Sequence, residues 1–163
     1  MRFFLSLLFI LFVSVSALSA QNLKKVYDEK ADAMAQIDSA LVEAAKSHRY
    51  VICQVGGNWC KWCLRFADYI TQDKEIADFI QSNFVYVHIN SSSRRVEQNN
   101  QNAIKRLGNP IRFGLPVMVV LDDDGNVLHT QDSSFLEEGE GYNKNKVMRF
   151  LRNWIPSSVE QSR

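Results

Sequence analysis

The sequence predicts an α/β fold in which a central mixed β-sheet is flanked by helices on both faces. Segments with helical periodicity alternate with short apolar runs in the order α-β-α-α-β-α-β-β-α, an alternation typical of layered α/β domains. Two of these runs, Tyr50–Val55 and Phe84–Ile89, are apolar or aromatic at nearly every position. Both faces of such strands are buried, which requires helices on each side of the sheet.

The composition is that of an ordinary globular domain. Of the 163 residues, 46% are hydrophobic and 23% are charged, and the formal net charge is +1. A chain this close to neutral gives no electrostatic reason to expect nucleic acid as a partner. Residues 21–163 have a suitable length for a single domain with a substantial core.

Residues 1–20 are predicted to be a cleaved signal peptide. Arg2 supplies a positive charge, Phe3–Val15 is almost unbroken apolar sequence, and small residues follow as far as Ala20. The apolar stretch is shorter than the roughly 20 residues that a membrane span needs. Cleavage after Ala17 and an uncleaved anchor are the alternatives. We therefore expect the mature protein in the periplasm or secreted.

Apolar residues at helical spacing and apolar runs predict the elements of the first half. A helix over Ala31–Ser47 precedes the strand Tyr50–Val55, and a second helix covers Leu64–Ile70. Asp73 is a suitable N-cap for a third helix, which leads into the strand Phe84–Ile89.

The second half is expected to contain a short helix, a β-hairpin and a last helix. A glycine ends the short helix, an Asp-Asp-Asp-Gly-Asn turn joins the two strands, and a proline ends the last helix. In chain order the segments are the irregular stretch Asn90–Asn99, the helix ending at Gly108, the strand Val117–Leu121, the turn Asp122–Asn126, the strand Val127–Thr130, the acidic loop Glu137–Gly141 and the helix ended by Pro156.

Two cysteines, Cys60 and Cys63, lie between the strand that begins at Tyr50 and the helix that follows it. Cys60 is thereby placed at a helix N-terminus, where unpaired N–H groups and the helix dipole favour a thiolate. The spacing predicts a redox-active pair. A structural zinc site would need a second Cys/His pair at ligand spacing, which Cys53 and three scattered histidines do not provide, and haem attachment would need histidine in place of Leu64. A Cu(I) site and a static disulfide remain as alternatives.

Further segments accompany this pair over most of the chain. They are Lys25-Val26-Tyr27-Asp28, Gly56-Gly57-Asn58-Trp59-Cys60, Gly108–Val117 with Phe113-Gly114-Leu115-Pro116 inside it, and Leu128-His129-Thr130-Gln131. With them, the chain from Lys25 to Trp154 resembles the thioredoxin superfamily, in particular its exported bacterial thioredoxin-like branch of thiol–disulfide oxidoreductases. The resemblance implies a thioredoxin-like fold and identifies Pro116 with the cis-proline of that family.

The two cysteines are expected to divide the catalytic work. Cys60, favoured by the helix end and the charge of Lys61, attacks a substrate disulfide, and Cys63 then resolves the mixed disulfide. Gln54 stands where thioredoxins carry a buried acid, and it cannot accept a proton at neutral pH. Water, a carboxylate from elsewhere or slower resolution must compensate. Cys53 points to the opposite face of the strand, and we expect it to be buried and unpaired.

Four residues are expected to contact the substrate: Trp59, Trp62, Leu115 and Pro116. Packing is the simpler interpretation of both tryptophans, and it is expected more of Trp59 than of Trp62. The resemblance implies that Pro116 lies against the dithiol and leaves the backbone of Leu115 free to pair with an extended substrate.

The sequence therefore predicts an exported enzyme that reduces or isomerises disulfides of periplasmic proteins through Cys60-Lys61-Trp62-Cys63. We expect no cofactor beyond the redox-active disulfide and no metal. The expected partners are protein substrates with disulfides and a membrane-bound dithiol electron donor, and the protein is expected to be a monomer. The alternative is a binding module of the same fold that holds Cu(I) or a client protein without turnover.

Overall fold

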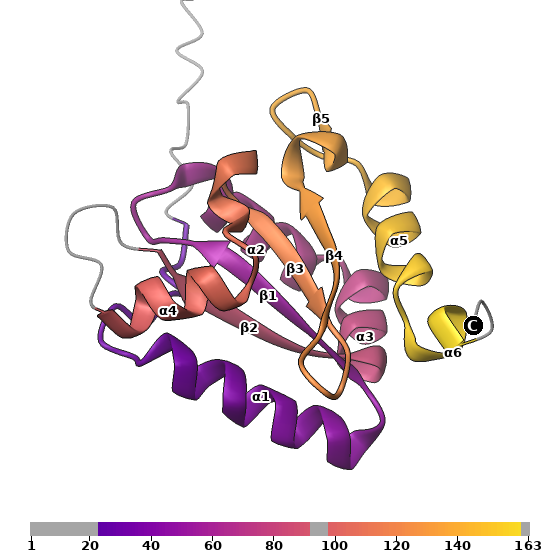
Figure 1. The fold of residues 1–163 in the computed structure, drawn as a ribbon. Helices are drawn as coiled ribbons and strands as arrows, with labels where there is room; N and C mark the ends of the chain where they lie inside the picture. Colours follow the sequence, from indigo (N-terminus) through magenta and orange to yellow (C-terminus); the bar gives the residue numbers. More distant parts are fainter. Residues whose placement is uncertain (1–22, 92–97, 161–163) are drawn as a thin grey trace, which may run out of the picture.

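A mixed four-stranded sheet lies at the centre of the computed structural model, which describes residues 23–91 and 98–160 (Figure 1). The strand order is β2-β1-β3-β4, with β1 and β2 parallel and the other two pairs antiparallel. The strands are β1 (Tyr50–Gly56), β2 (Phe84–Asn90), β3 (Val117–Leu121) and β4 (Val127–Asp132). The predicted signal peptide, residues 1–20, lies outside the described residues.

Helices cover both faces of the sheet, and the α/β fold predicted from the sequence is confirmed (Figure 1). One face packs against α1 and α4, and the opposite face packs against α2, α3 and α5. The helices are α1 (Ala33–Ser47), α2 (Lys61–Gln72), α3 (Lys74–Asn83), α4 (Gln98–Arg106), α5 (Lys144–Asn153) and α6 (Pro156–Glu160), and the 3-10 turns are η1 (Pro110–Phe113) and η2 (Ser133–Leu136). None of the helices in the described ranges has the length and apolar character to cross a membrane.

Side-chain caps fix where the helices begin. The Asp32 carboxylate accepts hydrogen bonds from the first turn of α1, and Asp73 does the same for α3, as the sequence predicted. Asn143 caps α5, and Cys60 caps α2 with its sulfur. Each cap satisfies N–H groups that have no partner within the helix.

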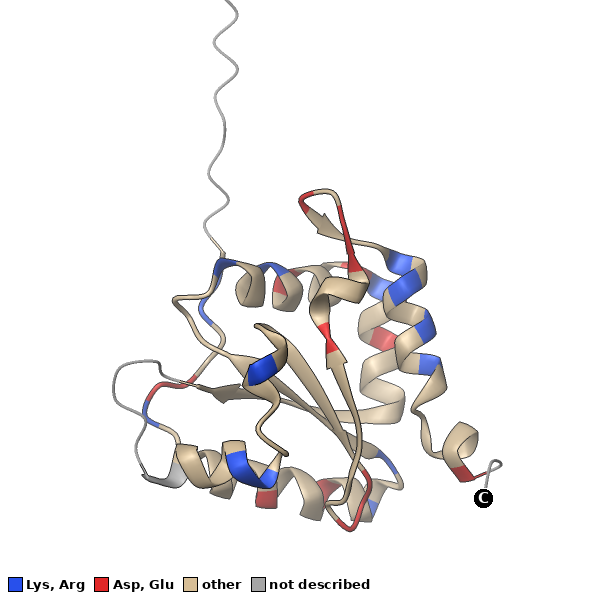
Figure 2. Ribbon diagram, turned by 45° about the horizontal axis from the view of Figure 1, so that its top comes forward, with Lys and Arg blue, Asp and Glu red and all other residues tan. Residues whose placement is uncertain are grey.

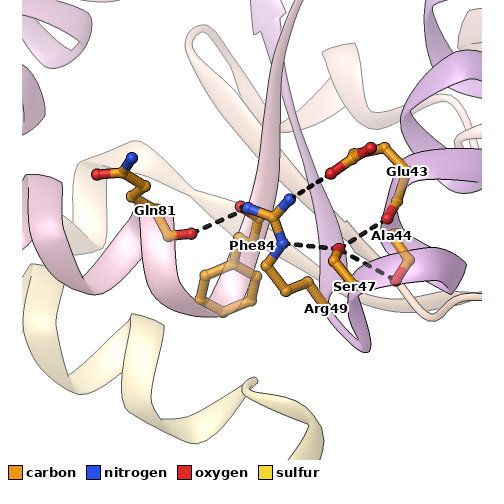
Figure 3. A network of polar contacts seen from close by, with 6 residues as sticks. All are labelled: Glu43, Ala44, Ser47, Arg49, Gln81 and Phe84. Atoms are coloured by element: carbon orange, nitrogen blue, oxygen red, sulfur yellow. Dashed lines mark hydrogen bonds and ion pairs between the residues drawn. The ribbon is translucent and has the colours of Figure 1, made fainter.

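Arg49 connects helices from both faces of the sheet at its β2 edge (Figure 3). Its guanidinium donates to the carbonyl oxygens of Gln81 and Phe84 at 2.9 and 3.2 Å, and it bonds Glu43 and Ser47 at the end of α1. One side chain thereby joins the ends of α1 and α3 to the first residue of β2.

Ion pairs link two of the helices on the other face. Lys144 Nζ lies 2.9 Å from a carboxylate oxygen of Asp73 and also 2.9 Å from one of Glu75. The Arg152 guanidinium lies 3.5 Å from the Glu75 carboxylate. Figure 2 shows basic residues along α5, the helix that packs beside α3. The contacts are partly or largely exposed, and such pairs each contribute little to stability.

Three sequence expectations are wrong in detail. The predicted acidic loop Glu137–Gly141 contains a small hairpin of β5 (Glu137–Glu138) and β6 (Gly141–Tyr142). Pro156 does not end α5, which stops at Asn153; it begins α6, because proline is well suited to a first helical position. Gln98 and Asn99, assigned to an irregular stretch, belong to α4.

Candidate active site

The turn from β1 into α2 carries the two cysteines, which form a disulfide. Cys60 has extended backbone angles at the N-cap of α2, and its sulfur accepts the N–H of Cys63 at 3.2 Å. The Cα atoms are 5.2 Å apart, within the ordinary range for a disulfide. The helix end thus presents its free N–H groups to the sulfur that the sequence assigns as nucleophile.

The two sulfurs differ in their access to solvent. Cys60 is 9% exposed and Cys63 is fully buried. Cys60 Sγ lies 3.9 Å from the carbonyl oxygen of Leu115, and the Leu115–Pro116 peptide bond is cis. Pro116 is buried, whereas Leu115 is half-buried and packs against the cysteine cluster. Of the two cysteines, Cys60 alone keeps some exposed area, so it is the one that an incoming disulfide can reach.

The burial of Trp59 and Trp62 is the reverse of what the sequence predicted. Trp59, expected to be the more packed of the two, is 56% exposed. Trp62 is half-buried: its ring lies edge-on to Tyr142 at 5.6 Å, and the Arg65 guanidinium lies over it at 5.2 Å. The reason is position, since Trp62 lies in the first turn of α2 beside β6, whereas Trp59 lies in the turn that precedes the helix.

Gln54 is completely buried and fully hydrogen-bonded behind the disulfide. Its amide nitrogen donates to the carbonyl oxygen of Cys63 at 3.0 Å and to the hydroxyl of Tyr27 at 2.5 Å. Its amide oxygen accepts from the hydroxyl of Tyr86 at 2.7 Å. The residue that replaces the thioredoxin acid therefore joins the backbone of Cys63 to the phenols of Tyr27 and Tyr86.

Sequence reasoning missed the contribution of Tyr27 and Asn58. The Asn58 side chain accepts from the N–H of Tyr27 at 3.1 Å and donates to its carbonyl oxygen at 2.8 Å, so it pairs with that backbone as a strand would. The sequence marks both residues only through the family resemblance. Their separation of 31 residues leaves no periodic signal in the sequence.

The other residues that the sequence singles out are Lys61, Cys53 and His129. Lys61 is exposed at the start of α2. Cys53 is a free, fully buried cysteine in the layer under α1, and burial raises the pKa of its thiol to about 12. His129 stacks on Trp154, with ring centroids 4.4 Å apart.

His88 lies on β2 opposite Gln54 and completes the buried polar group. Its ring meets those of Tyr27 and Tyr86 edge-on at 5.2 and 5.4 Å, and its Nε2 has no hydrogen-bond partner among the described residues. Burial lowers the pKa of His88 to about 4, so the ring is neutral at physiological pH. The described ranges contain no group of three or more metal-ligating side chains.

Comparisons with known proteins agree with this geometry. A family model described as "Thioredox_DsbH: Protein of unknown function, DUF255" matches residues 14–160. A disulphide isomerase from Xylella fastidiosa Temecula1 is 26% identical, with a TM-score of 0.66 over 80% of this chain and 97% of that chain. A thioredoxin from Thermus thermophilus is 16% identical, with a TM-score of 0.57 over 77% of this chain and 88% of that one, and supports the fold alone. No curated protein matches the sequence.

Proposed function

This chain belongs to the Thioredox_DsbH family of the thioredoxin superfamily and is a thiol–disulfide oxidoreductase, and we propose that it reduces or isomerises disulfides of exported proteins. The observation that carries the proposal is the Cys60–Cys63 disulfide, in which Cys60 caps a helix N-terminus and keeps 9% of its area exposed, whereas Cys63 is fully buried. This asymmetry separates an attacking thiol from a resolving thiol.

The proposed reaction proceeds in two exchanges. The Cys60 thiolate attacks one sulfur of the substrate disulfide, forms a mixed disulfide and expels the other substrate sulfur as a thiolate. Cys63 then attacks Cys60 Sγ, and the second substrate sulfur leaves. The substrate gains two electrons and two protons, and the enzyme ends with the Cys60–Cys63 disulfide. A dithiol donor must reduce that disulfide before the next cycle.

Substrate contacts are proposed around the reactive sulfur. The exposed indole of Trp59 offers apolar area beside Cys60, and Trp62 borders the same helix end. The carbonyl oxygen of Leu115, next to Pro116, faces Cys60 Sγ and suits pairing with the backbone of an extended peptide. Lys61 adds a positive charge that favours the thiolate.

The surroundings of the reaction are part of the proposal. We place the mature domain, residues 21–163, in the periplasm or outside the cell after removal of residues 1–20. It acts as a monomer on protein disulfides, with no cofactor beyond its own dithiol. A membrane-bound dithiol protein supplies the electrons, because an oxidising compartment offers no thiol pool for this task.

The reduction potential tests the direction of electron flow. The protein is equilibrated with glutathione buffers, and the oxidised fraction of the Cys60–Cys63 pair is measured by alkylation and mass. A reductase or isomerase is expected at roughly −200 mV or lower, whereas a potential near about −120 mV would identify a strong oxidant and contradict the proposal. Copper bound to the anaerobically purified, reduced protein would instead favour a Cu(I) module.

A further inference from the structure

The resolving cysteine presents a chemical difficulty that the proposed reaction leaves open. Cys63 must become a thiolate to attack Cys60, yet its sulfur is fully buried, and burial disfavours a charged thiolate. Gln54, the neighbouring polar side chain, carries no charge and has no proton-accepting group at neutral pH. Resting on the proposed function, we propose that the hydroxyl of Tyr27 donates a hydrogen bond to the Cys63 sulfur once the disulfide opens, and so stabilises the resolving thiolate.

The direction of the buried hydrogen bonds leaves the Tyr27 proton available. The carbonyl oxygen of Cys63 can only accept, so the Gln54 atom 3.0 Å from it must be the amide nitrogen. The amide oxygen then faces Tyr86, whose hydroxyl donates to it. The second amide hydrogen points at the Tyr27 oxygen, which accepts it. A phenol has a single proton, and that of Tyr27 is therefore directed away from Gln54.

The space around Gly56 places the Tyr27 hydroxyl beside the sulfur. A Cβ built on Gly56 would lie 2.6 Å from Cys63 Sγ and 2.6 Å from the Tyr27 oxygen. The two atoms therefore flank one small volume that the missing side chain of Gly56 leaves free. Tyr27, Cys60 and Cys63 also belong to one buried cluster with Leu64.

Asn58 explains how a residue from the N-terminal segment comes to lie there. Its amide holds both the N–H and the C=O of Tyr27, and it also donates to the Glu29 carboxylate at 3.0 Å. The clamp fixes Tyr27 to the same turn that carries the cysteines. The hydroxyl is thus positioned by the active-site loop itself.

The electrostatics require Tyr27 to act as a donor and not as a base. Burial raises its pKa far above the ordinary value for tyrosine, so the hydroxyl keeps its proton at every physiological pH. Behind Gln54, burial likewise raises the pKa of Tyr86 and lowers that of His88 to about 4, and both are neutral. On α2, the Lys61 side chain is exposed and the Arg65 guanidinium lies over the Trp62 ring. A thiolate at Cys63 would therefore be stabilised by neutral hydrogen-bond donors and by the N-terminus of α2.

The step balances without any additional reactant. The Cys63 thiol loses its proton to solvent, and the thiolate is held by the Tyr27 O–H until it attacks Cys60 Sγ. The new Cys63–Cys60 bond forms as the bond between Cys60 and the substrate sulfur breaks, and the departing thiolate takes a proton from solvent. Tyr27 ends the step with the proton it began with.

A stopped-flow experiment with a chromophoric aromatic disulfide tests this inference. Attack by Cys60 on the reagent releases the first coloured thiolate in a phase that depends on concentration, and attack by Cys63 releases the second in a phase that does not. Tyr27→Phe is expected to leave the first phase unchanged and to slow the second about tenfold at neutral pH, with its pH midpoint about one unit higher.

Two further variants separate the hydroxyl from the fold. Tyr142→Phe removes another buried phenol, one that donates to the carbonyl oxygen of Trp62 at 3.1 Å, and should leave the pH midpoint of the second phase in place. Asn58→Ser keeps the Tyr27 hydroxyl but loosens its clamp, and should slow the second phase less than Tyr27→Phe.

Each result has a definite meaning. An unchanged second phase in Tyr27→Phe, or an equal shift of the midpoint in Tyr142→Phe, overturns the role of Tyr27. If wild type lacks the first phase, Cys60 is not a nucleophile, and the proposed function falls together with the inference. If wild type shows the first phase and Tyr27→Phe leaves the second phase unchanged, the inference fails and the proposed function stands.

Discussion

Cys53 and Gln54 are neighbours on β1, yet their side chains enter different environments on opposite faces of the sheet. Cys53 lies among aliphatic side chains under α1 and α4, a layer with no part in the hydrogen-bond chain behind the disulfide. Gln54 lies under α2 and joins Tyr27, Tyr86 and the backbone of Cys63. One face of the strand therefore packs into an apolar layer, whereas the other carries the hydrogen bonds behind the dithiol.

Replacement of each cysteine gives the largest expected contrast between the two faces. Cys60→Ser removes the nucleophile and should lower disulfide reductase activity by at least about a thousandfold. Cys63→Ser should trap mixed disulfides with client proteins, because the attacking thiol remains and the resolving thiol is gone. Cys53→Ala should keep its activity. Activity is measured by reduction of a model protein disulfide, and trapping by non-reducing electrophoresis. Equal trapping by Cys60→Ser and Cys63→Ser would contradict the assignment of roles.

Stability should respond differently to substitution of the two neighbours. Gln54→Leu removes the hydrogen-bond partner of the Tyr27 and Tyr86 hydroxyls and of the carbonyl oxygen of Cys63, and should lower the free energy of unfolding by about 3 kcal/mol. Cys53→Ala removes a single buried atom from an apolar layer and should cost about 1 kcal/mol. Urea titration of the oxidised proteins measures both. A Gln54→Leu protein as stable as the Cys53→Ala protein would mean that the polar chain is energetically unimportant.

Much of the fold and the disulfide could be predicted from the sequence, because local patterns encode them. The apolar runs placed β1 and β3 within one residue, the Asp73 cap placed α3, and the Cys-x-x-Cys spacing placed the disulfide. These features depend on residues close together in the chain, where periodicity and spacing are informative.

The hydrogen-bond chain behind the disulfide could not be predicted, because its contacts join distant segments. Tyr27 reaches Gln54 across 27 residues, and Tyr86 reaches it across 32. No periodic pattern marks such a pair, and the hydroxyl of a tyrosine in an N-terminal segment carries no signal of its own. The exposure of Trp59 was missed for a related reason, since the path of the turn decides it and not the residue type.

The smallest expected effect concerns pH and again belongs to the polar face. His88 has a pKa of about 4 in the folded protein because burial disfavours its charged form, against about 6.5 in an unfolded chain. Below the unfolded value, the unfolded state binds the proton first, so stability present at neutral pH is lost as the pH falls toward the folded pKa. This difference should cost about 2 kcal/mol between pH 7 and about pH 5.

His88→Phe should abolish that portion of the pH dependence. Phenylalanine cannot be protonated, and its ring can keep the edge-on contacts with Tyr27 and Tyr86. The unpartnered Nε2 of His88 means that the exchange removes no hydrogen bond among the described residues. Urea titrations of both proteins at pH 8 set the baseline, since the histidine is neutral there in both states. The variant should lose about 2 kcal/mol less than wild type on acidification to about pH 5. If the two proteins lose stability in parallel, His88 is protonated as readily in the folded state as in the unfolded one, and the polar face opens to water more than its burial indicates.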